Sequence, residues 1–240
     1  MDFIQHYSGS SGNLYEVIAN NGKRLLIDPG VRWIQVQRAL KFNLEGIEGC
    51  FCSHGHQDHC KSLAAVRRAG IEIYATMTTM KSARVSGRRI NVVEGKTLVT
   101  AMESFSVYFF DTLHDCEGSL GFVVREKQTG EFLLFATDTK CIRQKFPYTF
   151  AIIAIECGYN GPYLAKRVAE GKTNEALAKR LLTSHMEESE ALRYLQDFCD
   201  LSQCREIHLL HMSADNINKE RVVAEYEKEL FLEARTIGQK

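Results

Sequence analysis

The residues best suited to chemistry in this 240-residue chain lie in one short stretch, Cys52-Ser53-His54-Gly55-His56-Gln57-Asp58-His59-Cys60. Three imidazoles and one carboxylate fall within six residues, soon after the apolar run 47–52. Imidazole and carboxylate groups are ligands of zinc, manganese and iron, and so dense a set suits two ions better than one. The stretch therefore predicts a metal site whose loop ligands are His54, His56, Asp58 and His59.

Further ligands are expected wherever other apolar, strand-like runs end. His114, Asp138 and His211 each stand directly after such a run. Loops at strand ends commonly build active sites on a rigid scaffold, so these three side chains are candidates for the same site. Two ions roughly 3.5–4 Å apart need a shared ligand, and the carboxylate of Asp138 is the natural one.

The composition is that of an ordinary globular protein, and its charge excludes few partners. Thirty basic and thirty acidic residues balance, whereas a dedicated duplex-DNA binder usually carries an excess of positive charge. One local exception is the basic stretch Lys81, Arg84, Arg88 and Arg89, which has no acidic residue between Glu72 and Glu94. Two interpretations stay open for it, a solvated face and a patch that contacts phosphate.

Neither a membrane span nor an export signal is apparent. No apolar run approaches the roughly 20 residues of a membrane-spanning helix, and residues 1–6 lack a basic and then apolar leader pattern. The eight cysteines are spread along the chain without a CxxC pair, which favours reduced thiols. We therefore expect a cytoplasmic protein with no membrane partner.

The pattern of apolar runs predicts an α/β protein, taken here as one domain over residues 1–240. Expected strands cover 3–7, 14–19, 24–27, 47–52, 71–75, 90–93, 97–99, 105–110, 120–125, 132–136, 150–155 and 207–210. Expected helices cover 31–40, 58–70, 77–84, 173–182, 187–199 and 219–232. Asp58 is expected to cap one helix and His185 to open another. Strands dominate the front and helices alternate with strands at the back, which favours two sheets between helices.

The order His54-x-His56-x-Asp58-His59, then His114, Asp138 and His211, resembles the metallo-β-lactamase superfamily over residues 54–211. The resemblance implies an αββα sandwich, two mixed sheets flanked by helices, with two divalent ions, Zn or Mn. It implies that His54, His56 and His114 bind one ion. Asp58, His59 and His211 would bind the other, with Asp138 bridging. Asp28, at a strand end, is expected to hydrogen-bond the histidine-rich loop.

More local features resemble one branch of that superfamily. Ser8-Gly9-Ser10-Ser11-Gly12-Asn13 and His211-Met212-Ser213-Ala214-Asp215-Asn216 look like the YycJ/WalJ-type members, which are regarded as nucleases. Glu156 and His185 resemble a pair in tRNase Z, in which a strand-end Glu holds a catalytic His. This implies that His185 is a general acid and that Glu156 orients it. Asp58 is also expected to be catalytic, orienting the nucleophile while it binds metal.

These features predict a two-metal phosphodiesterase or nuclease whose substrate is a nucleotide or single-stranded nucleic acid. The chain lacks the long arm with which tRNase Z grips tRNA, and it is also similar to phage phosphodiesterases that cleave cyclic mononucleotides. The alternative is a metallo-hydrolase of carbonyl substrates, such as a lactone, β-lactam or thioester. A non-enzymatic or diiron redox member is a third class, and a homodimer is left open.

Overall fold

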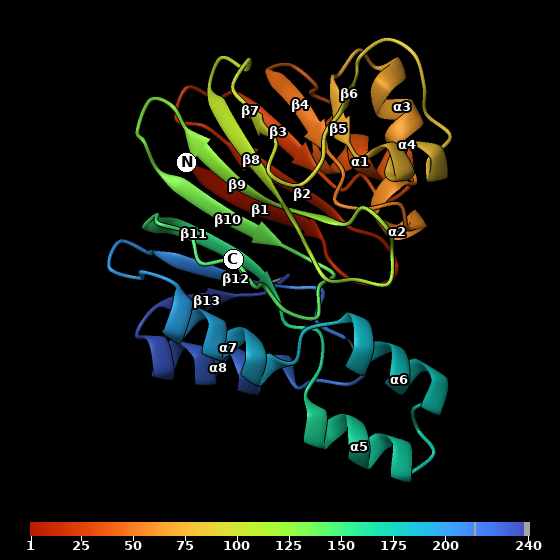
Figure 1. The fold of residues 1–240 in the computed structure, drawn as a ribbon, viewed down its shortest axis with the longest axis vertical. Coiled ribbons are helices and arrows are strands. Elements are labelled where there is room, and N and C mark those ends of the chain that lie inside the picture. Colours follow the sequence, from red (N-terminus) through yellow and green to blue (C-terminus); the bar gives the residue numbers. More distant parts are fainter. Residues whose placement is uncertain (214, 238–240) are drawn as a thin grey trace. The chain divides into compact units, whose positions relative to one another are not determined.

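The computed structural model describes residues 1–213 and 215–237 (Figure 1). Over these residues the chain has the expected α/β fold, with two mixed sheets flanked by helices. It divides into an N-terminal unit, Met1–Asp111 with Cys116–Glu131, and a C-terminal unit, Thr112–Asp115 with Phe132–Lys240. Ala214 of the His211-to-Asn216 motif and residues 238–240 lie outside the described residues. That residues 1–240 act as a single domain stays a prediction.

The N-terminal unit contains a mixed sheet in the order β1-β2-β3-β4-β5-β6. Its strands are β1 (Asp2–Tyr7), β2 (Leu14–Ile18), β3 (Arg24–Ile27), β4 (Ile47–Phe51), β5 (Ile73–Ala75) and β6 (Ile90–Val92). The first three are antiparallel, and Asn20-Asn21-Gly22 turns between β2 and β3 with Gly22 at a φ of 80°. From β3 to β6 the strands are parallel, so their carboxyl ends meet at one edge.

Short helices cover this sheet and its core. They are α1 (Trp33–Ala39), α2 (Gln57–Cys60), α3 (Leu63–Arg68) and α4 (Met77–Ser82). Val36, Val66 and Met80 bring apolar side chains from α1, α3 and α4 into one buried cluster with Leu26 and Cys50 of the sheet. The edge where β3, β4 and β5 end is therefore held on a rigid base.

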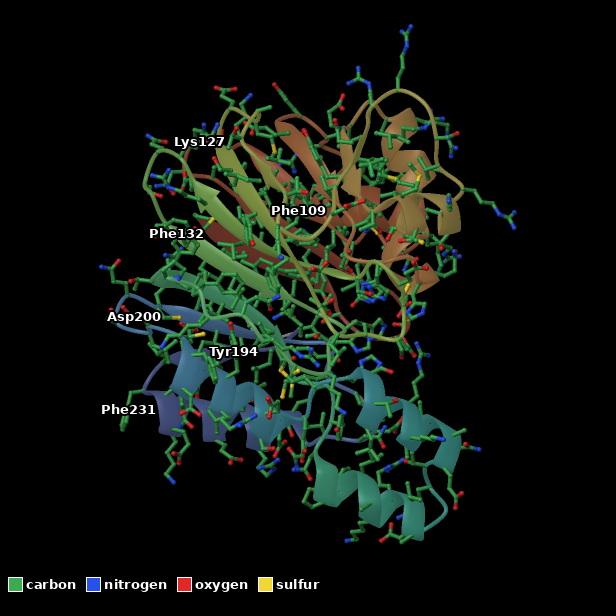
Figure 2. The ribbon with its side chains drawn as sticks, in the orientation of Figure 1. Phe109, Lys127, Phe132, Tyr194, Asp200 and Phe231 are labelled. Carbon is green, nitrogen blue, oxygen red and sulfur yellow. The ribbon has the colours of Figure 1, made fainter. Side chains whose placement is uncertain are left out.

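The same unit holds the antiparallel strands β7 (Leu98–Val99), β8 (Phe105–Asp111) and β9 (Leu120–Glu126). Their inward rings pack against β4. The ring centroid of Phe51 lies 5.6 Å from that of Phe109, which Figure 2 labels, and 5.8 Å from that of Phe122. This aromatic cluster packs against β4, the strand that leads into the loop with the histidines.

The C-terminal unit contains the parallel strands β10 (Phe132–Ala136), β11 (Phe150–Glu156), β12 (Glu206–Leu210) and β13 (Glu233–Arg235). The run FAIIAIE of β11 is buried along its whole length, as expected of a parallel strand covered on both faces. Because β10, β11 and β12 are parallel, the residues that follow them emerge at one edge.

The helices of this unit are α5 (Gly161–Ala169), α6 (Glu175–Ser184), α7 (Glu188–Phe198) and α8 (Lys219–Leu230). Figure 1 shows α5 beside α6 and α7 beside α8. Leu164 of α5 and Ala178 and Leu181 of α6 form a small core of their own with Tyr159. In the described part of the chain, no helix is long and apolar enough to cross a membrane. No disulfide joins the eight cysteines, which all lie among the described residues.

One predicted helix is broken in two, and Asp58 does not cap it. Asp58 lies inside α2, whose N-cap is His56, and α3 begins separately after Ser62. In a continuous helix the amide of Ser62 would donate to the carbonyl of Asp58. Instead that amide donates to Pro29 O (2.8 Å), and Asn13 N donates to Asp58 O (2.8 Å). Contacts with distant residues therefore end the helix.

The prediction that His185 opens a helix is also wrong. His185 is the C-cap of α6 in an extended conformation, and α7 starts three residues later at Glu188. Residues 185–187 align instead with residues 158–159, since Gly158 N donates to Met186 O (2.9 Å) and Tyr159 bridges to Glu187. Helix α5 and strand β13 were not expected from the sequence at all.

Candidate metal centre

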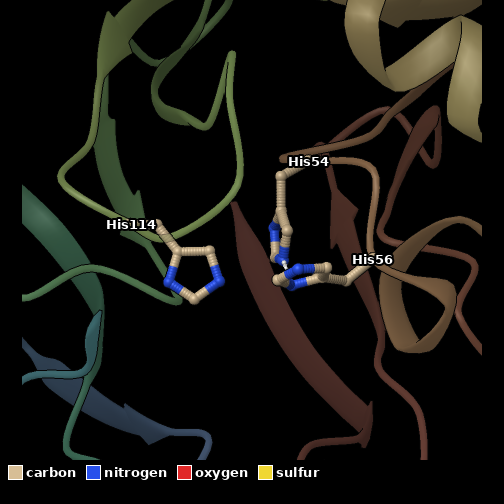
Figure 3. A group of neighbouring side chains, drawn as sticks. All are labelled: His54, His56 and His114. Atoms are coloured by element: carbon tan, nitrogen blue, oxygen red, sulfur yellow. Dashed lines mark hydrogen bonds between the residues drawn. The ribbon is translucent and has the colours of Figure 1, made fainter. Parts of the chain in front are cut away.

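Residues 52–60, here called the His loop, leave the carboxyl end of β4 and bring imidazoles together within the N-terminal unit. The Nε2 of His54 lies 3.0 Å from the Nδ1 of His56 (Figure 3), and the ring centroids of His54 and His59 are 4.1 Å apart. Two imidazole nitrogens at roughly 2.0–2.1 Å from one tetrahedral zinc lie about 3.3 Å apart. The spacing of the two nitrogens therefore fits a shared ion.

Asp28, directly after β3, fixes the orientation of His59 and the start of the loop. Its Oδ2 accepts from Ser53 Oγ (2.7 Å) and faces His59 Nδ1 (2.8 Å), while Oδ1 accepts from Ser53 N (2.7 Å). All three residues are buried. With Nδ1 held by the carboxylate, Nε2 is the nitrogen that His59 presents to a metal. The expected hydrogen bond from Asp28 to the loop is confirmed.

Asn13 is a buried contact of the His loop to which sequence reasoning assigned no role. Its Nδ2 lies 3.0 Å from His59 Nε2 and 3.1 Å from Asp58 O. Its Oδ1 accepts from Tyr15 Oη and from Gly9 N, both at 2.9 Å, which sets the direction of the amide. The only signal for it in the sequence is its place at the end of the Ser8-to-Asn13 motif.

Asp58 is the more exposed member of the loop ligands. Its side chain keeps 27% exposure, and its Oδ2 lies 3.8 Å from His59 Nε2. Gly30 fixes the backbone there, because a Cβ on Gly30 would lie 1.6 Å from Asp58 O. The carboxylate therefore stands at a defined position next to the histidines and remains open to solvent.

In the C-terminal unit, Asp138, Glu156 and His211 follow β10, end β11 and follow β12. Together with His185 they offer ligand atoms that all lie within 4.8 Å of one another. The Oδ2 of Asp138 is 3.7 Å from His114 Nε2, and its Oδ1 is 3.7 Å from His211 Nε2. Each carboxylate oxygen thus faces a different imidazole, which is the arrangement that a bridging ligand needs.

Three of the strand-end residues share an unusual backbone conformation. Asp28, Asp138 and His211 have φ values of 53°, 46° and 52°, in the left-handed region that non-glycine residues seldom adopt. Such strained positions cluster at functional sites, where the surrounding structure holds them. Six other non-glycine residues of the described chain adopt the same region, namely Lys41, Phe42, Arg84, Arg89, Lys96 and Phe231, so the conformation by itself does not mark a site.

Glu156 and His185 form a buried pair in the C-terminal unit. The Oε1 of Glu156 lies 2.6 Å from His185 Nδ1, and Oε2 accepts from Thr139 N at 2.5 Å. Burial opposes charge on the imidazole, but the Glu156 carboxylate outweighs it and raises the pKa of His185 to about 9. The ring of His185 stacks on that of His211 at 5.3 Å and 8°. The imidazole of His185 thus lies between the Glu156 carboxylate and a candidate ligand.

His114 is placed differently from His59. Its Nδ1 donates to Ser184 O (3.0 Å), and its Nε2 lies 3.1 Å from Asp115 Oδ1. Asp115 also pairs with Arg180 through Oδ2 (2.9 Å) and is 36% exposed. Asp115 and Asp138 therefore both lie near the same nitrogen of His114, Nε2.

The basic stretch Lys81–Arg89 runs from the last turn of α4 to the start of β6. Arg89 pairs with Glu72 at 3.0 Å, whereas no carboxylate of the described residues lies within 4.0 Å of Lys81, Arg84 or Arg88. All of them are exposed. Both interpretations of the stretch, a solvated face and a phosphate contact, stay predictions.

Donor chemistry and fold define the class of protein. The described His and Asp clusters are able to bind metal ions, and the scaffold has two mixed sheets flanked by helices. The protein-family model of the beta-lactamase superfamily domain matches the sequence over residues 23–212. The chain belongs to this family. No curated protein matches it.

Solved structures show the same fold at low sequence identity. YhfI of Bacillus subtilis, a metallo-beta-lactamase fold protein, has a TM-score of 0.73 and 14% identity, over 98% of this chain and 95% of its own. Zn²⁺-bound PqqB of Methylobacterium extorquens has a TM-score of 0.70 and 13% identity, over 100% of this chain and 99% of the PqqB chain. Human tRNase Z, short form, has a TM-score of 0.63 and 16% identity, over 98% of this chain and 96% of the tRNase Z chain.

Proposed function

We propose that this chain is a two-metal phosphodiesterase of the YycJ/WalJ- and tRNase Z-like branch, acting on nucleic acid or small cyclic nucleotides. The Glu156–His185 pair, with its 2.6 Å contact, carries the proposal. Cleavage of a phosphodiester expels an alkoxide that needs a proton, and a positioned imidazole acid supplies it. The fold likeness to a protein named tRNase Z supports the same direction.

The ligand assignment follows the order of the family motif. We assign His54, His56 and His114 to one ion, and Asp58, His59 and His211 to the other, with Asp138 shared. Zn²⁺ and Mn²⁺ suit this mixture of imidazole and carboxylate donors. When bound, such ions lower the pKa of water and offset negative charge on phosphoryl oxygens. Asp28 keeps His59 in the tautomer that ligation requires.

The chain's own residues would move the proton. Glu156 holds Nδ1 of His185, so Nε2 is the nitrogen that can donate to the leaving 3′ or 5′ oxygen. The amide of Thr139 fixes the other oxygen of Glu156 and so limits rotation of the carboxylate. Asp58, with its partly exposed oxygen, would orient the attacking water.

A hydrolysis panel tests the proposal. Purified full-length protein, loaded with Mn²⁺ or Zn²⁺, should hydrolyse bis-p-nitrophenyl phosphate and at least one of three natural classes, single-stranded DNA, RNA or cyclic mononucleotides. A lactone and a thioester serve as carbonyl controls. Activity on the carbonyl substrates with none on any phosphodiester would reverse the assignment in favour of a carbonyl hydrolase.

Two further parts of the proposal concern the setting. The absence of a disulfide among the eight described cysteines supports a reducing cytoplasm. A homodimer stays a prediction, and light scattering on the metal-loaded protein would detect it as a doubled mass.

A further inference from the structure

A cavity of about 320 Å³ lies in the C-terminal unit near the amino end of β11. Pockets for small ligands begin at roughly this size. Residues 145–149 form one wall and residues 197–200 the other. The two walls are joined, because Thr149 bridges to Asp200 and its Oγ1 donates to Asp200 Oδ2 at 3.2 Å. The cavity is therefore a defined part of the fold.

Each wall carries an aromatic ring that another ring supports from behind. Tyr148 stacks on Phe132 with centroids 4.4 Å apart and planes 11° from parallel. Phe198 stacks on Tyr194 at 5.7 Å and 4°, and Tyr194 Oη donates to Gln144 O at 2.9 Å. Figure 2 labels the supporting residues Phe132 and Tyr194. Tyr148 and Phe198 nevertheless stay 36% and 39% exposed. Two rings held still and partly exposed can stack on a flat ligand at low entropic cost.

The polar groups at the cavity match the edge of a nucleobase. Lys145 provides an ammonium donor and Asp197 a carboxylate acceptor. The carboxylate of Asp200 is already used, since it also accepts from Ser202 N at 3.0 Å. Nucleobases combine a flat apolar face with both donors and acceptors on the rim. The cavity therefore suits a base better than a purely apolar ring.

A basic segment connects this cavity to the candidate site. Strands β10 and β11 are parallel, so residues 139–149 must cross from the carboxyl end of β10 to the amino end of β11, a span of about 20 Å at roughly 3.3 Å per strand residue. Lys140, Arg143 and Lys145 are exposed along it, and no acidic residue occurs between Asp138 and Glu156. Lys140 stands close to the site, because its amide donates to Leu113 O at 2.8 Å.

We propose that the cavity binds a base of a single-stranded nucleic-acid substrate, with the phosphates between that base and the scissile bond lying along Lys140 and Arg143. Basic side chains that follow a backbone, combined with aromatic stacking, are the usual means of binding single strands. This inference rests on the proposed function and narrows it to polynucleotides, because a cyclic mononucleotide cannot occupy both places.

Binding is tested with the metal-loaded full chain and phosphorothioate-linked hexanucleotides, in DNA and RNA forms, that carry 2-aminopurine at one position in turn. Stacking in the cavity should quench the fluorescence at one position removed from the scissile bond. Tyr148→Ala and Phe198→Ala should each weaken binding roughly 5- to 150-fold and remove that quenching. Tyr163→Ala, a similarly exposed tyrosine on α5, is the matched control and should leave both unchanged. Tyr148→Leu replaces Tyr148→Ala if the latter does not fold.

Charge is tested separately through salt dependence. Lys140→Gln and Arg143→Gln should each lower the slope of log affinity against log salt by about one, whereas Lys166→Gln on α5 should not. Equal binding and quenching in all variants would overturn the inference, and the proposed function would stand if wild-type protein still hydrolyses bis-p-nitrophenyl phosphate. Failure of wild-type protein on every phosphodiester would instead overturn the function. A comparison of the DNA and RNA forms shows which type of nucleic acid the protein binds.

Discussion

The two units supply their candidate ligands in different ways. In the N-terminal unit they come from one loop, and a buried carboxylate, Asp28, holds both the start of that loop and His59. In the C-terminal unit Asp138 and His211 follow separate parallel strands, whereas His114 lies in the short segment Thr112–Asp115, and Asp138 faces both imidazoles. The first arrangement depends on local sequence, whereas the second depends on sheet topology.

The two units also differ in their pairs of carboxylate and imidazole. The C-terminal cluster contains a second carboxylate–imidazole pair, Glu156 and His185, in addition to Asp138 and His211. In the N-terminal cluster the Asp28 carboxylate lies 2.8 Å from His59 Nδ1, a position that serves metal binding. Under the proposed function, the N-terminal unit would mainly hold metal, and the C-terminal unit would also supply the proton.

Substitution of His185 should have the largest effect. His185→Ala should lower turnover of a phosphodiester roughly 10²- to 10⁴-fold, because the leaving oxygen loses its acid. Metal content, measured by atomic emission, should stay near that of the wild type. His6→Ala, which removes a histidine of β1 that contacts Glu16, is the control. Unchanged turnover would remove His185 from the mechanism and leave the two clusters alike.

Substitution of Asp28 should act through the metal. Asp28→Asn should weaken metal affinity roughly 10- to 100-fold, because His59 loses the acceptor that fixes its tautomer. Activity at low metal concentration should fall and then recover as metal is added. The His185→Ala defect should not recover in this way. A titration of activity against Mn²⁺ or Zn²⁺ distinguishes the two, and an Asp28→Asn defect that excess metal cannot restore would contradict the proposed division.

The sequence predicted the fold class and the positions of most strands because apolar runs are local. The buried run of β11 and the turn at Asn20-Asn21-Gly22 needed no tertiary information. The same is true of the His loop, whose histidines are neighbours in sequence. His114, Asp138 and His211 could be proposed because each follows such a run.

What sequence reasoning missed depends on contacts between distant residues. The break between α2 and α3 exists because Asn13 and Pro29 take hydrogen bonds that a helix would use. Thr139 contributes its backbone amide to Glu156, so its side-chain type gave no signal. The placement of His185 after α6 follows from alignment with Gly158 and Tyr159. Periodicity within one segment contains none of this information.

The smallest effect is expected at Asp115, which provides the sharpest comparison with Asp28. Both carboxylates lie beside a candidate ligand, but Asp28 is buried on Nδ1 of its histidine, whereas Asp115 is 36% exposed and lies on Nε2 of His114. Exposed ion pairs contribute about 0–1 kcal/mol, and a carboxylate on the nitrogen that faces Asp138 does not help to present that nitrogen to a metal. Asp115→Asn should therefore change metal affinity by less than about fivefold.

The two asparagine variants form a matched pair, since each removes one charge and keeps the shape of the side chain. Calorimetric titration with Zn²⁺ on both measures the difference directly. If Asp115→Asn weakens metal binding as much as Asp28→Asn does, burial and the choice of nitrogen are not what decides the role of the carboxylate. The orientation of His114 would then depend on Asp115 rather than on its bond to Ser184 O.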